Sequence, residues 1–251
     1  MIHFIGAGPG DPDLITVKGK KLIEQADIII YAGSLVNKDL LKDTKFDCKI
    51  YDSATMTLEE VIAVMEQGIS QGKKVARVHT GDPSIYGAIR EQMDELDHRG
   101  IYYEVIPGVS SFVAAAAALK KEYTLPGVTQ TVILTRMEGR TAVPKKESIE
   151  ALSAHNATMI VFLSVGMIEE LVERLKTGYK ENTPAAVVYK ASWPQEKIIR
   201  GTLSDIADLV KKEGIGKTAL VVVGNFLGSD YELSKLYDKS FTHEYRTGVG
   251  E

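Results

Sequence analysis

Three short turns that contain glycine or serine each follow an apolar run and precede a stretch with helical periodicity. They lie at residues 6–10, 80–87 and 107–111. Because ligands bind beyond the carboxyl ends of the strands in open α/β sheets, three such turns can converge on one crevice. Gly81 would let a backbone approach a ligand closely, and Asp82 would bind amines or hydroxyls or else cap the next helix. Serine capping alone would also explain the third turn, but together the turns predict a small-molecule site.

The first turn contains only part of a dinucleotide-binding pattern. The third glycine of that pattern would fall at Asp11, whose carboxylate repels phosphate. Pro9 also removes a backbone N–H where a pyrophosphate needs a donor. A plain tight turn is one alternative here, and a nicotinamide-dependent dehydrogenase is a weaker one.

Further polar residues at predicted strand ends are candidates for chemistry. His79 precedes the second turn and would act as a base or contact a substrate carboxylate, unless it is simply a hydrogen-bonded histidine at a strand end. His79 and Asp82 are therefore the candidate catalytic residues. Arg136 and Arg140 follow the first strand of the second half, and their planar guanidinium groups suit carboxylates, although a solvated charged loop would look the same.

Composition limits the class of protein. The chain has 251 residues, of which 44% are hydrophobic and 25% charged, and its net charge is −4, which is typical of a globular protein. Its basic residues form no dense tract, so we expect no nucleic-acid partner. Its single cysteine and the spacing of its five histidines predict no disulfide and no metal site. Without a signal-peptide pattern or an apolar run of about 20 residues, we expect a cytoplasmic protein without a membrane partner.

The elements of the first half alternate between strand and helix. Strands separated by helices of ten to fifteen residues favour a mostly parallel sheet with helices on both faces. We expect this α/β domain to span residues 1–120. The predicted strands are 2–5, 27–31, 48–51, 73–78 and 103–106, and the predicted helices are 14–25, 39–42, 58–71, 85–98 and 111–119.

The second half predicts a mixed sheet with helices, in a second α/β domain at residues 128–235 followed by a tail at 236–251. Only residues 190–196 separate two of its strands, which is too short for a helical crossover and favours an antiparallel pair. The predicted strands are 131–135, 159–163, 185–189, 197–200 and 219–223, and the predicted helices are 147–155, 168–176 and 203–212.

Several stretches, in order along the chain, resemble the tetrapyrrole (corrin and porphyrin) methylase family. They are Gly-Ala-Gly-Pro-Gly-Asp-Pro at 6–12, the Gly81-Asp82-Pro83 turn with Gly87, Pro-Gly-Val-Ser-Ser at 107–111 and Arg-Gly-Thr-Leu at 200–203. The resemblance covers residues 2–224. Residues 31–36, 52–57 and 135–141 and the tail at 236–246 are similar to the branch that methylates carbon 11 of precorrin-4 or cobalt-precorrin-4 in cobalamin biosynthesis.

The resemblance implies S-adenosylmethionine as methyl donor, S-adenosylhomocysteine as product and a tetrapyrrole substrate. It also implies a homodimer and an active-site cleft between the two α/β domains. By position, the cofactor would be bound by Pro9, Thr80, Gly81, Asp82, Ile85, Ser110, Ser111, Leu163 and Ala191. The substrate would be bound by Arg136, Glu138 and Arg140.

Two stretches depart from relatives that methylate uroporphyrinogen. Those relatives usually carry Phe-Met-Gly and Asn-Gly-Thr, where this chain has Phe-Leu-Ser-Val at 162–165 and Lys-Ala-Ser at 190–192. The departure agrees with the corrin branch. Methylation of another ring position and a non-catalytic sensor of small molecules remain the alternatives.

Overall fold

The computed structural model describes residues 1–139 and 141–249, so Arg140 and the last two residues of the tail lie outside the described part. The chain divides into two compact units. The first comprises Met1–Ala118 together with Lys190–Lys197, and the second comprises Leu119–Tyr189 together with the chain from Ile198 onward. The first unit therefore includes a short segment from far along the sequence.

The sheet of the first unit has the strand order β3-β2-β4-β1-β5, and all of its described strand pairs are parallel. The strands are β1 Ile2–Gly6, β2 Ile28–Tyr31, β3 Lys49–Asp52, β4 Val75–His79 and β5 Tyr103–Ile106. Since the strands run in the same direction, their carboxyl ends lie at one edge of the sheet. The predicted parallel sheet is confirmed.

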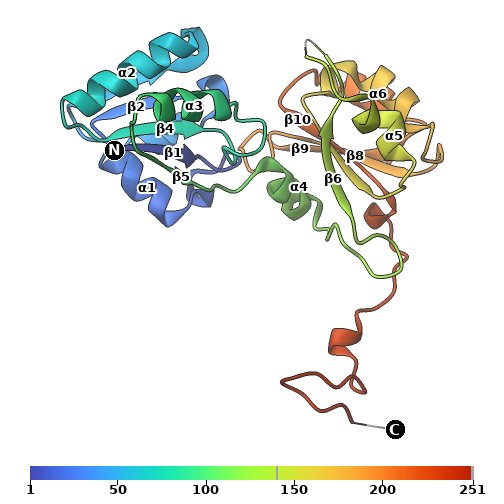
Figure 1. Cartoon of the computed structure of the whole chain (residues 1–251). Helices are drawn as coiled ribbons and strands as arrows, with labels where there is room; N and C mark the ends of the chain where they lie inside the picture. Colours follow the sequence, from blue (N-terminus) through green and yellow to red (C-terminus); the bar gives the residue numbers. More distant parts are fainter. Residues whose placement is uncertain (140, 250–251) are drawn as a thin grey trace. The chain divides into compact units, whose positions relative to one another are not determined.

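Helices cover both faces of this sheet, as predicted (Figure 1). They are α1 Val17–Glu24, α2 Leu58–Ser70 and α3 Arg90–His98, and a fourth helix, α4 Ser111–Leu119, follows β5 along the chain. Successive side chains of a strand point to opposite faces, which divides the core in two. Ile5 of β1 lies in the cluster that contains Ile23 of α1. Phe4 lies in the cluster that contains Met65 of α2 and Leu96 of α3.

Helix α3 is shorter than its apolar periodicity predicts. The helix was expected from residue 85, but it begins at Arg90. Tyr86 and Ala88 have left-handed φ angles of 56° and 49°, which an α-helix does not accommodate. A Cβ on Gly87 would lie 2.1 Å from the Pro83 carbonyl oxygen, so the chain folds back on itself here. Residues 80–89 thus form a long connection at the carboxyl end of β4.

The second unit contains a mixed sheet in the order β6-β7-β10-β8-β9. Strands β6 and β7 are parallel, whereas β10 is antiparallel to both β7 and β8. The strands are β6 Val132–Arg136, β7 Thr158–Phe162, β8 Pro184–Tyr189, β9 Lys197–Thr202 and β10 Ala219–Val223. The helices are α5 Ile149–Ser153, α6 Ile168–Leu175 and α7 Ile206–Lys212. Ile149, Leu171 and Ile206 of these helices share one buried cluster with the sheet, as expected for a mixed sheet with helices.

Short 3-10 helices connect many of these elements, and the tail adds one more. The tail is organised by Arg246, whose guanidinium donates hydrogen bonds to the carbonyl oxygens of Leu236 and Asp238. Within residues 1–139 and 141–249, no helix is long and apolar enough to cross a bilayer. The 3-10 helices are Pro12–Leu14, Gly33–Leu35, Lys38–Leu41, Ser53–Thr55, Lys145–Glu147, Val165–Met167, Asn225–Leu227 and Lys235–Tyr237.

Candidate functional site

Three turns meet at the carboxyl edge of the first sheet: the first turn (residues 6–11), the second turn (residues 80–88) and the third turn (residues 107–111). The N–H of Ala7 donates to the carbonyl oxygen of His79 at 2.7 Å. Gly8 and Gly81 exchange two backbone hydrogen bonds of 3.2 and 2.8 Å. Because β1 lies between β4 and β5 in the sheet, its turn contacts both of the others.

Glycine is needed where these backbones touch. A Cβ on Gly108 would lie 2.1 Å from the carbonyl oxygen of Gly81 and 2.7 Å from the Cα of Gly6. Gly81 also has a φ of +61°, which favours glycine. The glycines of the three turns therefore allow backbone to pack directly on backbone.

The Asp82 carboxylate joins the second turn to the third. Its Oδ2 accepts a hydrogen bond of 2.8 Å from the N–H of Gly108, and its Oδ1 accepts one of 2.8 Å from the N–H of Ser84. Burial raises the pKa of Asp82, but the hydrogen bonds from Ser84 and Gly108 outweigh it and leave the pKa below its usual value. Since α3 begins eight positions later, Asp82 does not cap that helix. It is an ionised brace between two turns.

His79 lies beneath the turns, on the sheet face covered by α2 and α3. Its side chain stacks on Phe4 with 6.0 Å between ring centroids, and only 2% of the residue is exposed. Its Nε2 atom is buried and has no hydrogen-bond partner among the described residues. Burial, together with the positive charge of Arg77, lowers the pKa of His79 to about 3. The ring is neutral at neutral pH, and its catalytic role stays a prediction.

The cap segment, residues 190–197, covers the first turn. The indole Nε1 of Trp193 donates a hydrogen bond of 2.9 Å to the carbonyl oxygen of Pro9. The N–H of Asp11 donates one of 3.0 Å to the hydroxyl of Ser192. A Cβ on Gly10 would lie 2.0 Å from the indole Cδ1, so the ring packs against bare backbone. The motifs of the sequence did not indicate Trp193, although a lone tryptophan between two predicted strands is a signal that could have identified it.

Most of the predicted cofactor residues come together in the first unit. Thr80, Ile85 and Ser111 are half-buried, while Ser110 and Ala191 are buried. This edge thus offers hydroxyl groups, backbone polar groups and an apolar side chain, which suits a small molecule with polar and apolar parts. Among the described residues, no group of His, Cys, Asp and Glu side chains could hold a metal ion. The predicted cofactor residues at this edge are Pro9, Thr80, Gly81, Asp82, Ile85, Ser110, Ser111 and Ala191.

Leu163 and the predicted substrate residues lie in the second unit. Leu163 follows β7 and has a left-handed φ of 55°, which is uncommon for a residue other than glycine. Its side chain is apolar, yet the residue is 69% exposed. Arg136 ends the parallel neighbour β6 and pairs in register with Phe162, so Arg136 and Leu163 lie at the same edge of that sheet. The Arg136 guanidinium donates to the carbonyl oxygens of Thr141 and Ala142 at 3.2 and 3.0 Å.

Glu138 forms an ion pair with a helix of the second unit. Its carboxylate pairs with Arg174 of α6, which holds the pKa of Glu138 below its usual value. Arg140 lies outside the described residues. Arg136 and Glu138 therefore organise one loop, which the sequence identified from its charges.

Residues 31–36 and 52–57, two of the stretches that resemble the branch methylating carbon 11, contact each other at the carboxyl ends of β2 and β3. The Tyr31 hydroxyl donates to the Asp52 carboxylate at 2.9 Å, and the Ser53 hydroxyl donates to the Tyr31 carbonyl oxygen at 3.1 Å. The Asn37 amide donates to the carbonyl oxygen of Gly10 at 2.8 Å, which ties this pair to the first turn. Residues 31–36 and 52–57 thus share the edge that carries the three turns.

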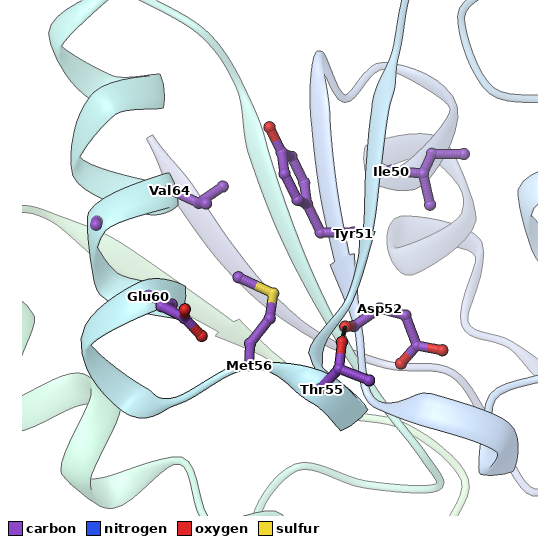
Figure 2. Close-up of a pocket in the computed structure, with 8 residues that line it drawn as sticks. Ile50, Tyr51, Asp52, Thr55, Met56, Glu60 and Val64 are labelled. Atoms are coloured by element: carbon purple, nitrogen blue, oxygen red, sulfur yellow. Dashed lines mark hydrogen bonds between the residues drawn. The ribbon is translucent and has the colours of Figure 1, made fainter.

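A separate groove of about 590 Å³ lies between β3 and α2 (Figure 2). None of the predicted site residues lines it. Its two carboxylates already have protein partners, because Asp52 accepts from Tyr31 and Glu60 accepts from the N–H of Thr57. The converging turns therefore remain the stronger candidate. The groove is lined by Ile50, Tyr51, Asp52, Thr55, Met56, Glu60, Ala63 and Val64.

The sequence profile described as Tetrapyrrole (Corrin/Porphyrin) Methylases matches residues 1–207, a span that contains the three turns and the cap segment. The chain belongs to this family. The family resemblance that the sequence motifs indicated is thereby confirmed.

Family members that are named for a reaction are similar to this chain over nearly its whole length. A cobalt-precorrin-4 C(11)-methyltransferase of Methanocaldococcus jannaschii is 63% identical over 247 residues, which cover 98% of this chain and 95% of that protein. The solved structure of a cobalamin biosynthetic enzyme, a cobalt precorrin-4 methyltransferase, matches with a TM-score of 0.89 and 48% identity, over 91% of this chain and 96% of that one.

A more distant solved structure contains a bound nucleoside. It is the uroporphyrin-III C-methyltransferase of Thermus thermophilus in complex with S-adenosylhomocysteine. It matches with a TM-score of 0.74 and 25% identity, over 90% of this chain and 92% of that one. The predicted fold of two α/β parts is confirmed by these likenesses.

Proposed function

We propose that this chain transfers a methyl group from S-adenosylmethionine to carbon 11 of precorrin-4 or cobalt-precorrin-4, a step of cobalamin biosynthesis. One observation carries the proposal: the protein of Methanocaldococcus jannaschii that is named for this reaction is 63% identical over 98% of the chain. The converging turns, the paired stretches at 31–36 and 52–57, and the loop of Arg136 all lie within that match.

The turns of the first unit would hold the methyl donor. S-adenosylmethionine supplies a methyl group on a sulfonium sulfur, which departs as a neutral thioether and requires no acid from the protein. The task left to the chain is positioning, which can contribute several kcal/mol, about 7 to 11 in well-oriented systems. Rigid backbone turns braced by Asp82 suit that task. The hydroxyls of Thr80 and Ser111 and the side chain of Ile85 would contact the polar and apolar parts of the donor.

The loop of the second unit would hold the acidic side chains of the tetrapyrrole. Arg136 ends β6, and its guanidinium already fixes the loop through the carbonyl oxygens of Thr141 and Ala142. A guanidinium can bind a carboxylate with two parallel hydrogen bonds. Arg140 would add a second positive charge to the same loop.

The proposed reaction is tested with purified protein, S-adenosylmethionine and each of the two forms of the substrate. Mass spectrometry should show the gain of one methyl group, and NMR with a carbon-13 methyl donor should place it on carbon 11. A methyl on another ring carbon would favour the alternative methylase. Tight cofactor binding without transfer would favour a sensor. A thermal shift with NAD and none with S-adenosylmethionine would favour a dehydrogenase.

We also propose, from the family resemblance, that the chain works as a homodimer in the cytoplasm. Light scattering after size-exclusion chromatography tests the dimer, because it reports the mass of the particle directly. A monomeric mass at the concentration of the assay would contradict it.

A further inference from the structure

We propose that Trp193 is a positioning residue that holds the first turn in the shape required to bind the nucleoside methyl donor. The inference rests on the proposed function and concerns how the cofactor site is assembled. It assigns a role to the cap segment beyond the contact expected of Ala191.

The indole holds the first turn in two ways. Its Nε1 donates to the carbonyl oxygen of Pro9 at 2.9 Å, which fixes the direction of that peptide. Its ring also lies over Gly10, where any side chain would collide with it, since a Cβ would be 2.0 Å from Cδ1. The adjacent hydroxyl of Ser192 accepts from the N–H of Asp11 at 3.0 Å. Ser192 and Trp193 of the cap segment thus contact three consecutive residues of the first turn, at 9–11.

The cap segment is itself held in one conformation. The Glu196 carboxylate accepts a hydrogen bond of 2.7 Å from the N–H of Ser192. The ammonium of Lys190 lies 5.4 Å from the centroid of the Trp193 ring. Lys190 and Ser192 have left-handed φ angles of 47° and 68°, which non-glycine residues keep only when their surroundings impose them. The indole is therefore presented to the first turn by a preorganised loop.

This arrangement predicts how cofactor affinity depends on Trp193. When only a fraction of molecules has the competent shape, the apparent Kd equals the intrinsic Kd divided by that fraction. Removing the indole releases the Pro9 peptide and uncovers Gly10, so the competent fraction falls. The effect should appear in the affinity for the methyl donor, while the tetrapyrrole contacts of the Arg136 loop are unaffected.

Calorimetric titration with S-adenosylmethionine tests the inference on a graded set of variants. Trp193→Phe keeps a ring but loses the donor, and should raise Kd about threefold, in line with one neutral hydrogen bond. Trp193→Ala loses the ring as well as the donor and should raise Kd about tenfold or more. The KM for the methyl donor should rise in parallel, whereas kcat at saturating donor and the KM for the tetrapyrrole should stay within about twofold. Tyr102→Ala removes an exposed aromatic at the opposite edge of the sheet and should change none of these values.

Gly10 provides an independent variant of the same contact. In Gly10→Ala the new methyl group displaces the indole, and at the Gly10 φ of +159° a side chain also strains the turn, so Kd should rise at least as much as in Trp193→Ala. The double variant should be no worse than Gly10→Ala alone, because two changes that break the same contact are not additive. A multiplied loss would show that Gly10 and Trp193 act separately.

Fluorescence reports the contact without any turnover, because Trp193 is the only tryptophan of the chain. Its emission should titrate with S-adenosylmethionine at the Kd found by calorimetry, and acrylamide should quench it more strongly in Gly10→Ala than in the wild type. Wild-type donor affinity in Trp193→Ala would overturn the inference and leave the proposed function intact. Failure of the wild-type protein to bind the donor would instead overturn the proposed function.

Discussion

The Asp82 carboxylate accepts a hydrogen bond of 2.8 Å from the backbone N–H of Gly108. The two residues follow β4 and β5, which are not neighbours in the sheet, because β1 lies between them. The contact therefore reaches across the end of a central strand. It closes the set of three turns into one backbone framework.

Loss of this brace should cost stability and cofactor affinity together. In Asp82→Asn the amide nitrogen faces a backbone donor on one side, so we expect a decrease of about 2 kcal/mol in the free energy of unfolding, typical of a hydrogen bond to a charged group. Urea denaturation and calorimetric titration measure the two effects. Asp47→Asn, at an exposed position, is the control. An unchanged unfolding midpoint in Asp82→Asn would contradict the bracing role.

Gly108→Ala should separate the turns. Its Cβ would lie 2.1 Å from the carbonyl oxygen of Gly81, and backbone cannot yield as a flexible side chain would. We expect a loss of about 2 kcal/mol or more in stability and loss of measurable binding of S-adenosylmethionine. In Gly216→Ala the added methyl meets nothing within 4 Å, so this matched control should be neutral or slightly stabilising. Similar unfolding curves for both variants would show that the close backbone contact is unimportant.

The neutral, buried His79 should make the protein sensitive to acid. An unfolded histidine binds a proton near pH 6.5, whereas burial lowers the pKa of His79 to about 3. Between these values the unfolded state binds more protons, so stability falls as the pH decreases and is unaffected by this group above pH 6.5. The loss should be about 2 kcal/mol between pH 6.5 and 5.

A pair of variants isolates this effect. His79→Phe keeps a ring against Phe4 and removes the titration, so its free energy of unfolding should depend less on pH in this range. His98→Asn replaces an exposed histidine of α3 and serves as the control for loss of a histidine. Equal slopes of stability against pH in wild type and His79→Phe would argue against a buried neutral ring.

Arg136→Ala should separate the two binding functions. Without the guanidinium the loop loses its hydrogen bonds to the carbonyl oxygens of Thr141 and Ala142, and the proposed substrate site loses a positive charge. We expect tetrapyrrole affinity to fall about tenfold or more, because a charged hydrogen bond is worth about 1.5 to 3 kcal/mol. The affinity for S-adenosylmethionine should be retained. Arg90→Ala, at an exposed ion pair of α3, is the control, and equal loss of both affinities in Arg136→Ala would exclude a substrate-specific role.

Local patterns were sufficient to predict both sheets and most helices. Ile28–Tyr31 is buried throughout, as a strand covered on both faces must be, and its continuous apolar run was readable from the sequence. The three turns could also be predicted from local sequence, because glycine is typical of places where one backbone segment packs against another. Periodicity failed at the start of α3, because the left-handed residues Tyr86 and Ala88 leave the apolar spacing unchanged.

The parts of the site that could not be predicted depend on distant contacts. Trp193 and Pro9 are 184 positions apart, and no local pattern links them. The sequence likewise left open whether Asp82 binds a ligand or caps a helix, and one of its actual partners, Gly108, lies 26 positions away. Residue types predicted which groups could do chemistry, and the sheet determined which of them meet.

The origin of the cap segment has a consequence for how the chain is made. Lys190–Lys197 belongs to the first unit but is encoded after β8 of the second. Domains ordinarily fold from the N-terminus while the ribosome is still translating. Here the sheet of β1 to β5 can form early, yet Gly10 stays uncovered until translation has passed Trp193. A nascent chain released before that point would carry the glycine turns without their indole cover.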